Sequence, residues 1–323
     1  MGSLQQFGIG LIQALQTMSP ALDGVMNFFT FLGRIEFYII FIPLIYWTID
    51  KRTGFRALLV LIFIDFAGTT FKLLFHQPRP YWFGEVRKLT EEASYGIPST
   101  HASDSLAVGG YLAYRVKKPW FWMVMVFILF FIGLSRLYLG AHFPHDVIFG
   151  WLIGAAVLWG FMKLDDRVAG WAGSQTLSTR LGMGFIVSLG IILIGLASHS
   201  FIAEVPDTPA WQGFASGARS ISQFFTLSGA FFGSIAGYAL MLQYARFKTQ
   251  SKFGILIFRY LVGIIVLVLI YIGLDKAFSL VSVDETFLGY VLRYIRYAAI
   301  TFWTTFGAPW VYLKTRLAEI ETS

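Results

Sequence analysis

The segment from Ser135 to Asp146 carries the residues best suited to chemistry, and it lies between two strongly apolar runs. His142 and Asp146 are four residues apart, so a helix that begins near Phe143 would bring the carboxylate within reach of the imidazole. A carboxylate that holds one ring nitrogen leaves the other free to act as a nucleophile or a base. Arg136 adds a cation in a position that is costly beside a membrane. Together these residues predict a site for an anion.

Two other segments carry residues of the same kind. Lys72 and Arg79, which is followed by Pro80, come at the end of an apolar run, where they could also be interface anchors with their stems along apolar surface. The sequence Pro98-Ser99-Thr100-His101 opens the next run and could be an ordinary helix N-cap. The candidate residues of the three segments are three cations (Lys72, Arg79 and Arg136), two histidines (His101 and His142) and Asp146, a set that membrane anchoring alone does not explain.

These segments must be positioned by membrane helices, because the composition is that of a polytopic membrane protein. Of the 323 residues, 56% are hydrophobic and only 13% are charged, whereas soluble domains have about a quarter of their residues charged. The net charge of +7 could suggest nucleic acid, but the Lys and Arg residues lie in short loops between apolar spans, as cytoplasmic anchors do. We therefore expect no nucleic-acid partner. The chain has no cysteine, which excludes disulfides and thiolate catalysis.

The apolar runs predict an all-α bundle that crosses the membrane about nine times, with about 20 residues for each crossing. Residues 4–18 precede these runs and predict a short amphipathic helix that lies in the membrane interface or covers the core. The predicted spans are 25–48, 55–75, 100–115, 119–137, 145–163, 181–202, 222–244, 254–274 and 289–312.

The loops between these spans predict an orientation. Loops rich in Lys and Arg, such as 115–118, alternate with acidic or mixed loops, such as the one that holds Glu204 and Asp207. By the positive-inside rule the N-terminus lies outside and the C-terminus is cytoplasmic. Loops 76–99 and 136–145 then both face the extracytoplasmic side, so the three candidate segments share one face.

In these three segments the chain resembles the type-2 phosphatidic acid phosphatase (PAP2) superfamily. Its signature is Lys-x6-Arg-Pro, then Pro-Ser-Gly-His, then Ser-Arg-x5-His-x3-Asp. The first and third motifs match at every position, and the second matches except that Thr100 replaces the usual glycine. Pro-Ser-Thr-His is similar to the second motif of sphingosine-phosphate phosphatases. The residues around Arg79-Pro80-Tyr81-Trp82 and around His142-Phe143-Pro144-His145 are similar to glucose-6-phosphatase.

The resemblance implies a phosphatase mechanism and a role for each matching residue. His142 would attack phosphorus and carry the phosphoryl group, Asp146 would fix the tautomer of His142, and His101 would protonate the leaving oxygen and then activate water. The phosphate would be held by Lys72, Arg79, Ser99, Thr100 and Arg136. We expect neither a metal nor another cofactor. His145, beside the pair, is expected to support it rather than to react.

The resulting prediction is a six-helix catalytic core with a three-helix C-terminal extension. The domain boundaries would be 1–23 for the interfacial helix, 24–202 for the core and 203–323 for the extension. The predicted reaction is hydrolysis of a phosphate monoester or diphosphate of a lipid, with a sugar phosphate as the alternative. A transporter that only binds a phosphorylated solute is the rival from another class, although binding would not require the set of His101, His142 and Asp146. A silent scaffold would be favoured by a missing histidine or arginine, and none is missing. The substrate itself and the oligomeric state are not predicted.

Overall fold

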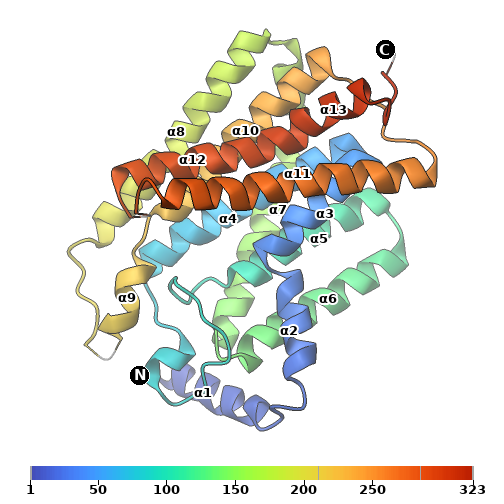
Figure 1. Cartoon of the computed structure of the whole chain (residues 1–323). Helices are drawn as coiled ribbons and strands as arrows, with labels where there is room; N and C mark the ends of the chain where they lie inside the picture. Colours follow the sequence, from blue (N-terminus) through green and yellow to red (C-terminus); the bar gives the residue numbers. More distant parts are fainter. Residues whose placement is uncertain (1, 210, 284, 322–323) are drawn as a thin grey trace. The chain divides into compact units, whose positions relative to one another are not determined.

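A computed structural model describes residues 2–209, 211–283 and 285–321, and Figure 1 shows that its regular elements are helices. An isolated bridge between Phe247 and Ile320 is the exception within these ranges. The α-helices are α1 (Ser3–Gln16), α2 (Asp23–Leu32), α3 (Ile35–Thr48), α4 (Lys51–Phe75), α5 (Thr100–Val116), α6 (Pro119–Tyr138), α7 (Pro144–Ser174), α8 (Leu177–Ile202), α9 (Gln212–Ala218), α10 (Ser222–Tyr244), α11 (Phe253–Ser279), α12 (Phe287–Phe302) and α13 (Ala308–Lys314). A 3-10 helix, η1, covers Pro80–Phe83, and a π-helix, η2, covers Trp303–Gly307.

Several of these helices can cross a membrane. Among the described residues, six are long and apolar enough to do so, or seven if the bent pair α2 and α3 forms one span. The six are α4, α6, α7, α8, α10 and α11. Every other span of the sequence prediction also falls on helix, but α5 has 17 residues and α12 has 16, and both carry polar or charged side chains. The described residues thus contain six or seven candidate spans rather than the predicted nine. Crossings by α5 and by the segment that begins with α12 stay a prediction.

The span predicted at 25–48 is interrupted. Helices α2 and α3 meet at a bend of 53° after Gly33, so this segment is not one straight helix. A Cβ at Gly33 would lie 3.1 Å from both Cβ and Cδ2 of His101, so the close approach favours glycine here. The bend therefore coincides with a contact to one of the candidate site residues.

The chain divides into two compact units. Unit 1 combines the N-terminal residues up to Tyr38 with Phe63–Met162 and Gly195–Ile221. Unit 2 combines Ile39–Ile62, Lys163–Ile194 and the residues from Ser222 on. The helices α3, α4, α7 and α8 contribute residues to both.

In unit 1, α6 packs against α1, α2 and α5 (Figure 1). Helix α1 is held by Gln16, whose amide nitrogen donates hydrogen bonds to the carbonyls of Arg87 and Tyr138. Its buried side includes Ile9 and Ile12, whereas Leu4, Phe7 and Leu11 are exposed. One side of α1 therefore covers the protein, and the exposed apolar side chains remain available to a membrane interface.

In unit 2, α10 packs closely on α12. Gly229, Gly233 and Gly237 recur every four residues on α10. A Cβ at any of them would lie within 2.2 Å of an atom of the α12 and η2 segment, for example 2.1 Å from the carbonyl oxygen of Ala298 at Gly233. Small residues at this spacing allow membrane helices to bring their backbones together, so these glycines set the helix separation.

Candidate active site

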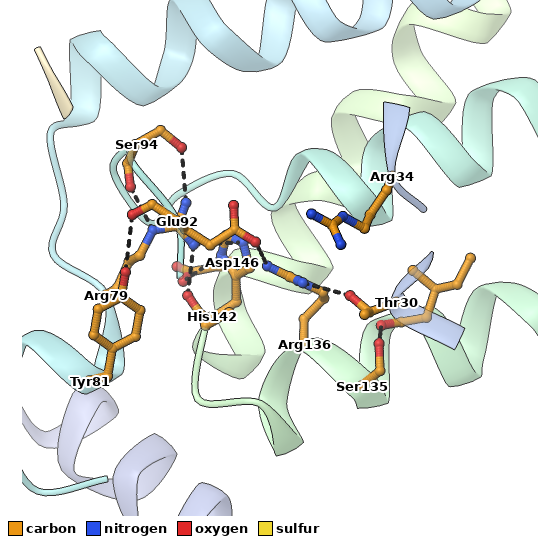
Figure 2. Close-up of polar contacts among 12 residues, drawn as sticks. Thr30, Arg34, Arg79, Tyr81, Glu92, Ser94, Ser135, Arg136, His142 and Asp146 are labelled. Carbon is orange, nitrogen blue, oxygen red and sulfur yellow. Dashed lines mark hydrogen bonds and ion pairs between the residues drawn. The ribbon is translucent and has the colours of Figure 1, made fainter. Parts of the chain in front are cut away.

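The three segments chosen from the sequence come together inside unit 1. Lys72 lies in the last turn of α4, Arg79 precedes η1, and Arg136 lies near the end of α6. His142 lies in the loop between α6 and α7 and Asp146 in the first turn of α7, and Figure 2 shows these two residues close to Arg79 and Arg136. Each of the following side chains belongs to a residue that is at most 4% exposed: Lys72, Arg79, Ser99, Arg136, His142 and Asp146. Buried charges must be paired, so this concentration of charge marks a polar site.

His142 lies between a carboxylate and a guanidinium. Its Nδ1 is 3.4 Å from Oδ2 of Asp146, and its Nε2 is 3.1 Å from Nη1 of Arg79 (Figure 2). The same Oδ2 accepts a hydrogen bond of 2.9 Å from the main-chain N–H of Phe143, which fixes the carboxylate at the start of α7. The arrangement fits the tautomer with its proton on Nδ1, so that Nε2 has a lone pair.

Arg79 is held by main-chain carbonyls and by the hydroxyl of Ser94, and among the described residues its guanidinium forms no ion pair. Its Nη1 donates to the carbonyl of Ala141 at 2.9 Å, and its Nη2 donates to Ser94 Oγ at 2.9 Å and to the carbonyl of Tyr95 at 3.1 Å. The carbonyl of Tyr95 also accepts a bond of 2.8 Å from Nζ of Lys72. One peptide group in loop 84–99 thus orients two of the three cations, whose charge remains available to an anion.

The segment from Pro98 to His101 lies against the first turn of α7 because α5 and α7 pack closely. Ser99 is the N-cap of α5, and its N–H donates a 3.0 Å hydrogen bond to the carbonyl of Asp146. A Cβ at Gly150 on α7 would lie 2.5 Å from the Ser99 carbonyl oxygen, so glycine permits this approach. The amides of Thr100 and His101 are then in the first turn of α5, where helix N–H groups lack intrahelical partners.

Arg136 links α6 to two other elements. Its Nη1 donates a 2.6 Å hydrogen bond to Oγ1 of Thr30 on α2, and its Nη2 is paired with the carboxylate of Glu92. Ser135, the neighbouring residue of the same motif, bonds instead to the carbonyl of Ile132 in its own helix at 2.7 Å. His145 Nε2 lies 3.3 Å from Oδ1 of Asp146, on the side of the carboxylate away from His142.

Several buried polar atoms of this cluster have no hydrogen-bond partner in the described part of the chain. They include Ser99 Oγ, His101 Nε2 and Arg136 Nε. Buried polar groups in proteins are nearly always satisfied, so unpartnered atoms gathered around cations indicate a place for a ligand with acceptor oxygens. Among the described residues, no group of three or more His, Asp and Glu side chains is arranged to bind a metal ion.

The electrostatic surroundings keep His142 neutral. Burial lowers the pKa of His142, and the charges of Arg79, Lys72 and Arg136 lower it further, to well below its usual range. The imidazole is therefore unprotonated at neutral pH, so one of its ring nitrogens has a lone pair.

Comparisons with known proteins agree with this arrangement. The family model described as "PAP2 superfamily" matches residues 53–168, which contain all three motifs, and the model described as "PAP2 superfamily phosphatase, transmembrane extension" matches residues 225–320. The chain belongs to the PAP2 superfamily. It is accordingly an integral multi-pass membrane protein.

Three relatives illustrate the range of the PAP2 superfamily around this chain. Sphingosine-1-phosphate phosphatase 2 of Mus musculus is 32% identical over 42% of this chain and 40% of its own length. Glucose-6-phosphatase 3 of Bos taurus is 28% identical over 55% and 60%, and sphingosine-1-phosphate phosphatase 1 of Mus musculus is 25% identical over 88% and 70%. The chain spans about half the length of the curated relatives that it matches.

The PAP2 motifs do not include every residue that builds the site. Sequence reasoning missed Thr30, Glu92, Ser94 and Tyr95. Tyr95 contributes its main-chain carbonyl, which leaves no trace in residue type, and Ser94 contributes its main-chain carbonyl as well as its hydroxyl. Glu92 did offer a signal, because Glu91 and Glu92 form an acidic pair in the loop that joins the first motif to the second.

Proposed function

We propose that this PAP2 protein hydrolyses a phosphate monoester, or a diphosphate, through a phosphohistidine at His142. The observation that carries the proposal is the position of the His142 imidazole, with Nδ1 facing Asp146 and Nε2 beside Arg79 in a cluster that has unpartnered donors. An imidazole that is neutral and oriented in this way is a nucleophile next to an anion site.

In the first step, Nε2 of His142 forms a bond to phosphorus as the bond from phosphorus to the ester oxygen breaks. His101 gives its proton to the leaving oxygen, so that an alcohol departs rather than an alkoxide. Asp146 holds the Nδ1 proton and stabilises the positive charge that develops on the ring. In the second step, His101 takes a proton from water, whose oxygen attacks phosphorus while the bond from phosphorus to Nε2 breaks. Inorganic phosphate then leaves.

The charge that spreads over the phosphoryl oxygens is neutralised by Lys72, Arg79 and Arg136. The Ser99 hydroxyl and the amides of Thr100 and His101 at the start of α5 complete the cradle. Thr100 contributes its backbone N–H, so a threonine can stand where the motif usually has glycine. With three cations in these positions, the proposed reaction requires no metal.

The favoured substrate is a lipid phosphate. Lys72, Arg136 and Asp146 are carried by α4, α6 and α7, which are candidate membrane spans, so the acyl or sphingoid chain of a substrate can stay in the bilayer while its phosphate enters. Relatives named sphingosine-1-phosphate phosphatase and lipid phosphate phosphatase support this class. A sugar phosphate is the second candidate, because relatives named glucose-6-phosphatase 3 match a similar share of the chain.

We further propose that the site faces the extracytoplasmic or lumenal side, with the N-terminus on that side and the C-terminus in the cytoplasm. The alternation of basic loops supports this orientation. Helix α5 and the segment from α12 to α13 would then complete nine crossings. Residues 24–202 would form the catalytic core, 203–323 the three-helix extension and 1–23 the interfacial helix.

The test is phosphate release by purified protein in detergent, with EDTA present. The substrates are phosphatidic acid, a sphingoid-base phosphate, an isoprenyl diphosphate and glucose 6-phosphate. Each is repeated with His142→Asn, which keeps an amide where Nδ1 faces Asp146 but removes Nε2. The matched control is His199→Asn, because His199 bonds through Nδ1 to the carbonyl of Arg219 at 3.0 Å and an amide can replace that contact.

Release that persists in EDTA and in His199→Asn but is lost in His142→Asn supports the proposal, and the preferred substrate decides between lipid and sugar. A second readout is an acid-labile ³²P label on the protein, which should form in the wild type and not in His142→Asn. Binding of all four substrates without turnover would contradict a phosphatase and favour a transporter.

A further inference from the structure

Glu92 is an acidic residue placed among the cations of the anion site. It lies in the loop between η1 and α5, and its carboxylate is paired with Nη2 of Arg136 (Figure 2). Its main-chain carbonyl accepts a 3.0 Å hydrogen bond from the hydroxyl of Tyr81. The backbone of the loop is therefore fixed independently of the carboxylate, which reaches into the cluster from an anchored position.

The electrostatic field at Glu92 is the field that would act on a bound phosphate. Burial raises the pKa of Glu92, but the charges of Arg136 and Arg79, with smaller contributions from His101 and Lys72, outweigh burial and hold this pKa well below its usual range. Glu92 is thus ionised at any physiological pH. These four groups are ones to which a catalytic role is proposed above. Arg136, Arg79 and Lys72 would bind the substrate phosphate, and His101 would protonate the leaving oxygen.

The contacts of Arg136 indicate that Glu92 is a replaceable partner. Thr30 accepts the bond from Nη1 and Glu92 accepts from Nη2, while Nε has no hydrogen-bond partner among the described residues. A phosphate group offers three oxygens and up to two negative charges, so it can satisfy both Nε and Nη2, whereas the structure gives Glu92 a contact to Nη2. Asp146, by contrast, is fixed by the N–H of Phe143 and lies beside His142.

We propose that Glu92 is an internal anion that occupies the phosphate site of the empty enzyme and is displaced from Arg136 when substrate phosphate binds. This inference rests on the function proposed above. It explains how the buried Arg136 is neutralised before substrate arrives, since an uncompensated buried charge is costly. It also gives the enzyme a way to release its product, because the returning carboxylate competes with inorganic phosphate for Arg136.

The experiment compares the affinity of inorganic phosphate for the wild type, Glu92→Gln and Glu91→Gln. Glu91 is the matched control, because it is the adjacent residue, carries the same charge and pairs at the surface with Lys88, with its own side chain 82% exposed. Dissociation constants are measured by isothermal titration calorimetry on the full chain in detergent, and the inhibition constant of phosphate is measured in the hydrolysis assay.

If Glu92 occupies the site for about nine-tenths of the time, its removal should tighten phosphate binding about tenfold, because apparent affinity scales with the fraction of open site. Glu91→Gln should bind as the wild type does. Product inhibition by phosphate should become stronger in Glu92→Gln by a similar factor. Glu92→Asp, which keeps the charge but has a shorter reach, should give a smaller gain, and it serves as the test if the glutamine variant does not fold.

Unchanged affinity in Glu92→Gln would overturn the inference, since Glu92 would then not compete with phosphate. Weaker binding would also overturn it, because Glu92 would then support the position of Arg136. Absence of phosphate binding to both the wild type and Glu92→Gln would overturn it as well. Failure of the proposed function is a separate result: it would appear as phosphate binding without hydrolysis of any substrate, and the binding comparison would still decide the role of Glu92.

Discussion

The main-chain N–H of Ser99 donates a 3.0 Å hydrogen bond to the main-chain carbonyl of Asp146. This bond joins the start of α5 to the first turn of α7, and so joins the segment that carries His101 to the one that carries His142. Because it is a backbone contact, the relative position of the two histidines depends on how closely the two helices approach each other.

The first prediction concerns that approach. In Gly150→Ala, the new Cβ would lie 2.5 Å from the Ser99 carbonyl oxygen, so α5 and α7 must separate. Overpacking of this kind costs about 1–3 kcal/mol of stability, and a misplacement of about 1 Å can reduce activity about 100-fold. We expect kcat/KM to fall about 10- to 100-fold, with a lower melting temperature. Gly160→Ala on the same helix meets nothing within 4 Å and is the control. Wild-type activity in Gly150→Ala would refute this reading of the contact.

The second prediction concerns the partner of His142. Asp146→Asn keeps the size of the side chain and can still accept from Phe143 N–H, but it loses the charge that, in the proposed mechanism, selects the His142 tautomer. The same change in a Ser-His-Asp triad costs about 10⁴-fold in kcat, and we expect a fall of about 10³- to 10⁴-fold here. Asp166→Asn changes an acid of the same helix whose side chain is 86% exposed, and it should be neutral. A fall of less than tenfold in Asp146→Asn would mean that the carboxylate does not orient the nucleophile.

The third prediction concerns the support of loop 84–99. The hydroxyl of Tyr95 donates a 3.1 Å hydrogen bond to Asp207, which is itself paired with Arg219. Tyr95→Phe removes this bond but leaves the carbonyl that orients Lys72 and Arg79. A hydrogen bond of this kind contributes about 1 kcal/mol, so KM should rise a few-fold while kcat changes little. Tyr114→Phe, at a residue that is 47% exposed, is the control. A large drop in kcat with unchanged KM would contradict a positioning role.

Local spacing explains why the candidate residues could be chosen from the sequence. His142 and Asp146 are neighbours because a helix begins between them, and Ser99 precedes a helix start that Pro98 and polar residues indicate. Arg136 could be chosen because a charge at the end of an apolar run is costly. Residue type and short-range geometry were sufficient in each case.

The rest of the site depends on contacts that short-range patterns do not contain. Thr30 and Arg136 are 106 positions apart in the chain. The bend after Gly33 was missed because a long apolar run hides such a break, and the close approach of Gly33 to His101 joins residues far apart in the chain. The amphipathic pattern predicted a helix at 4–18 but not which of its apolar residues would be buried: Ile12 is buried whereas Phe7 and Leu11 are exposed, because packing against α6 selects the buried side.

The last prediction concerns pH. Protonation of His142 would remove the lone pair of Nε2, so the protonated form cannot act as the proposed nucleophile. The lowered pKa of His142 means that protonation occurs only at a pH below the usual value of about 6.5. The acid limb of kcat/KM that belongs to His142 should therefore lie below pH 6.5. Lys72 is one of the charges that lower this pKa, so Lys72→Met should move the limb to higher pH as well as weaken binding.

Wild type and Lys72→Met must be compared on the same phosphate monoester, because the substrate itself also titrates near pH 6 and its contribution cancels in the comparison. The matched control is Lys88→Met, which removes a lysine that pairs with Glu91 at the surface, with its own side chain 40% exposed. Lys88→Met should leave the limb in place. An acid limb that stays at the same pH in Lys72→Met would show that it does not report on His142, and the nucleophile would then have to be identified by the ³²P label alone.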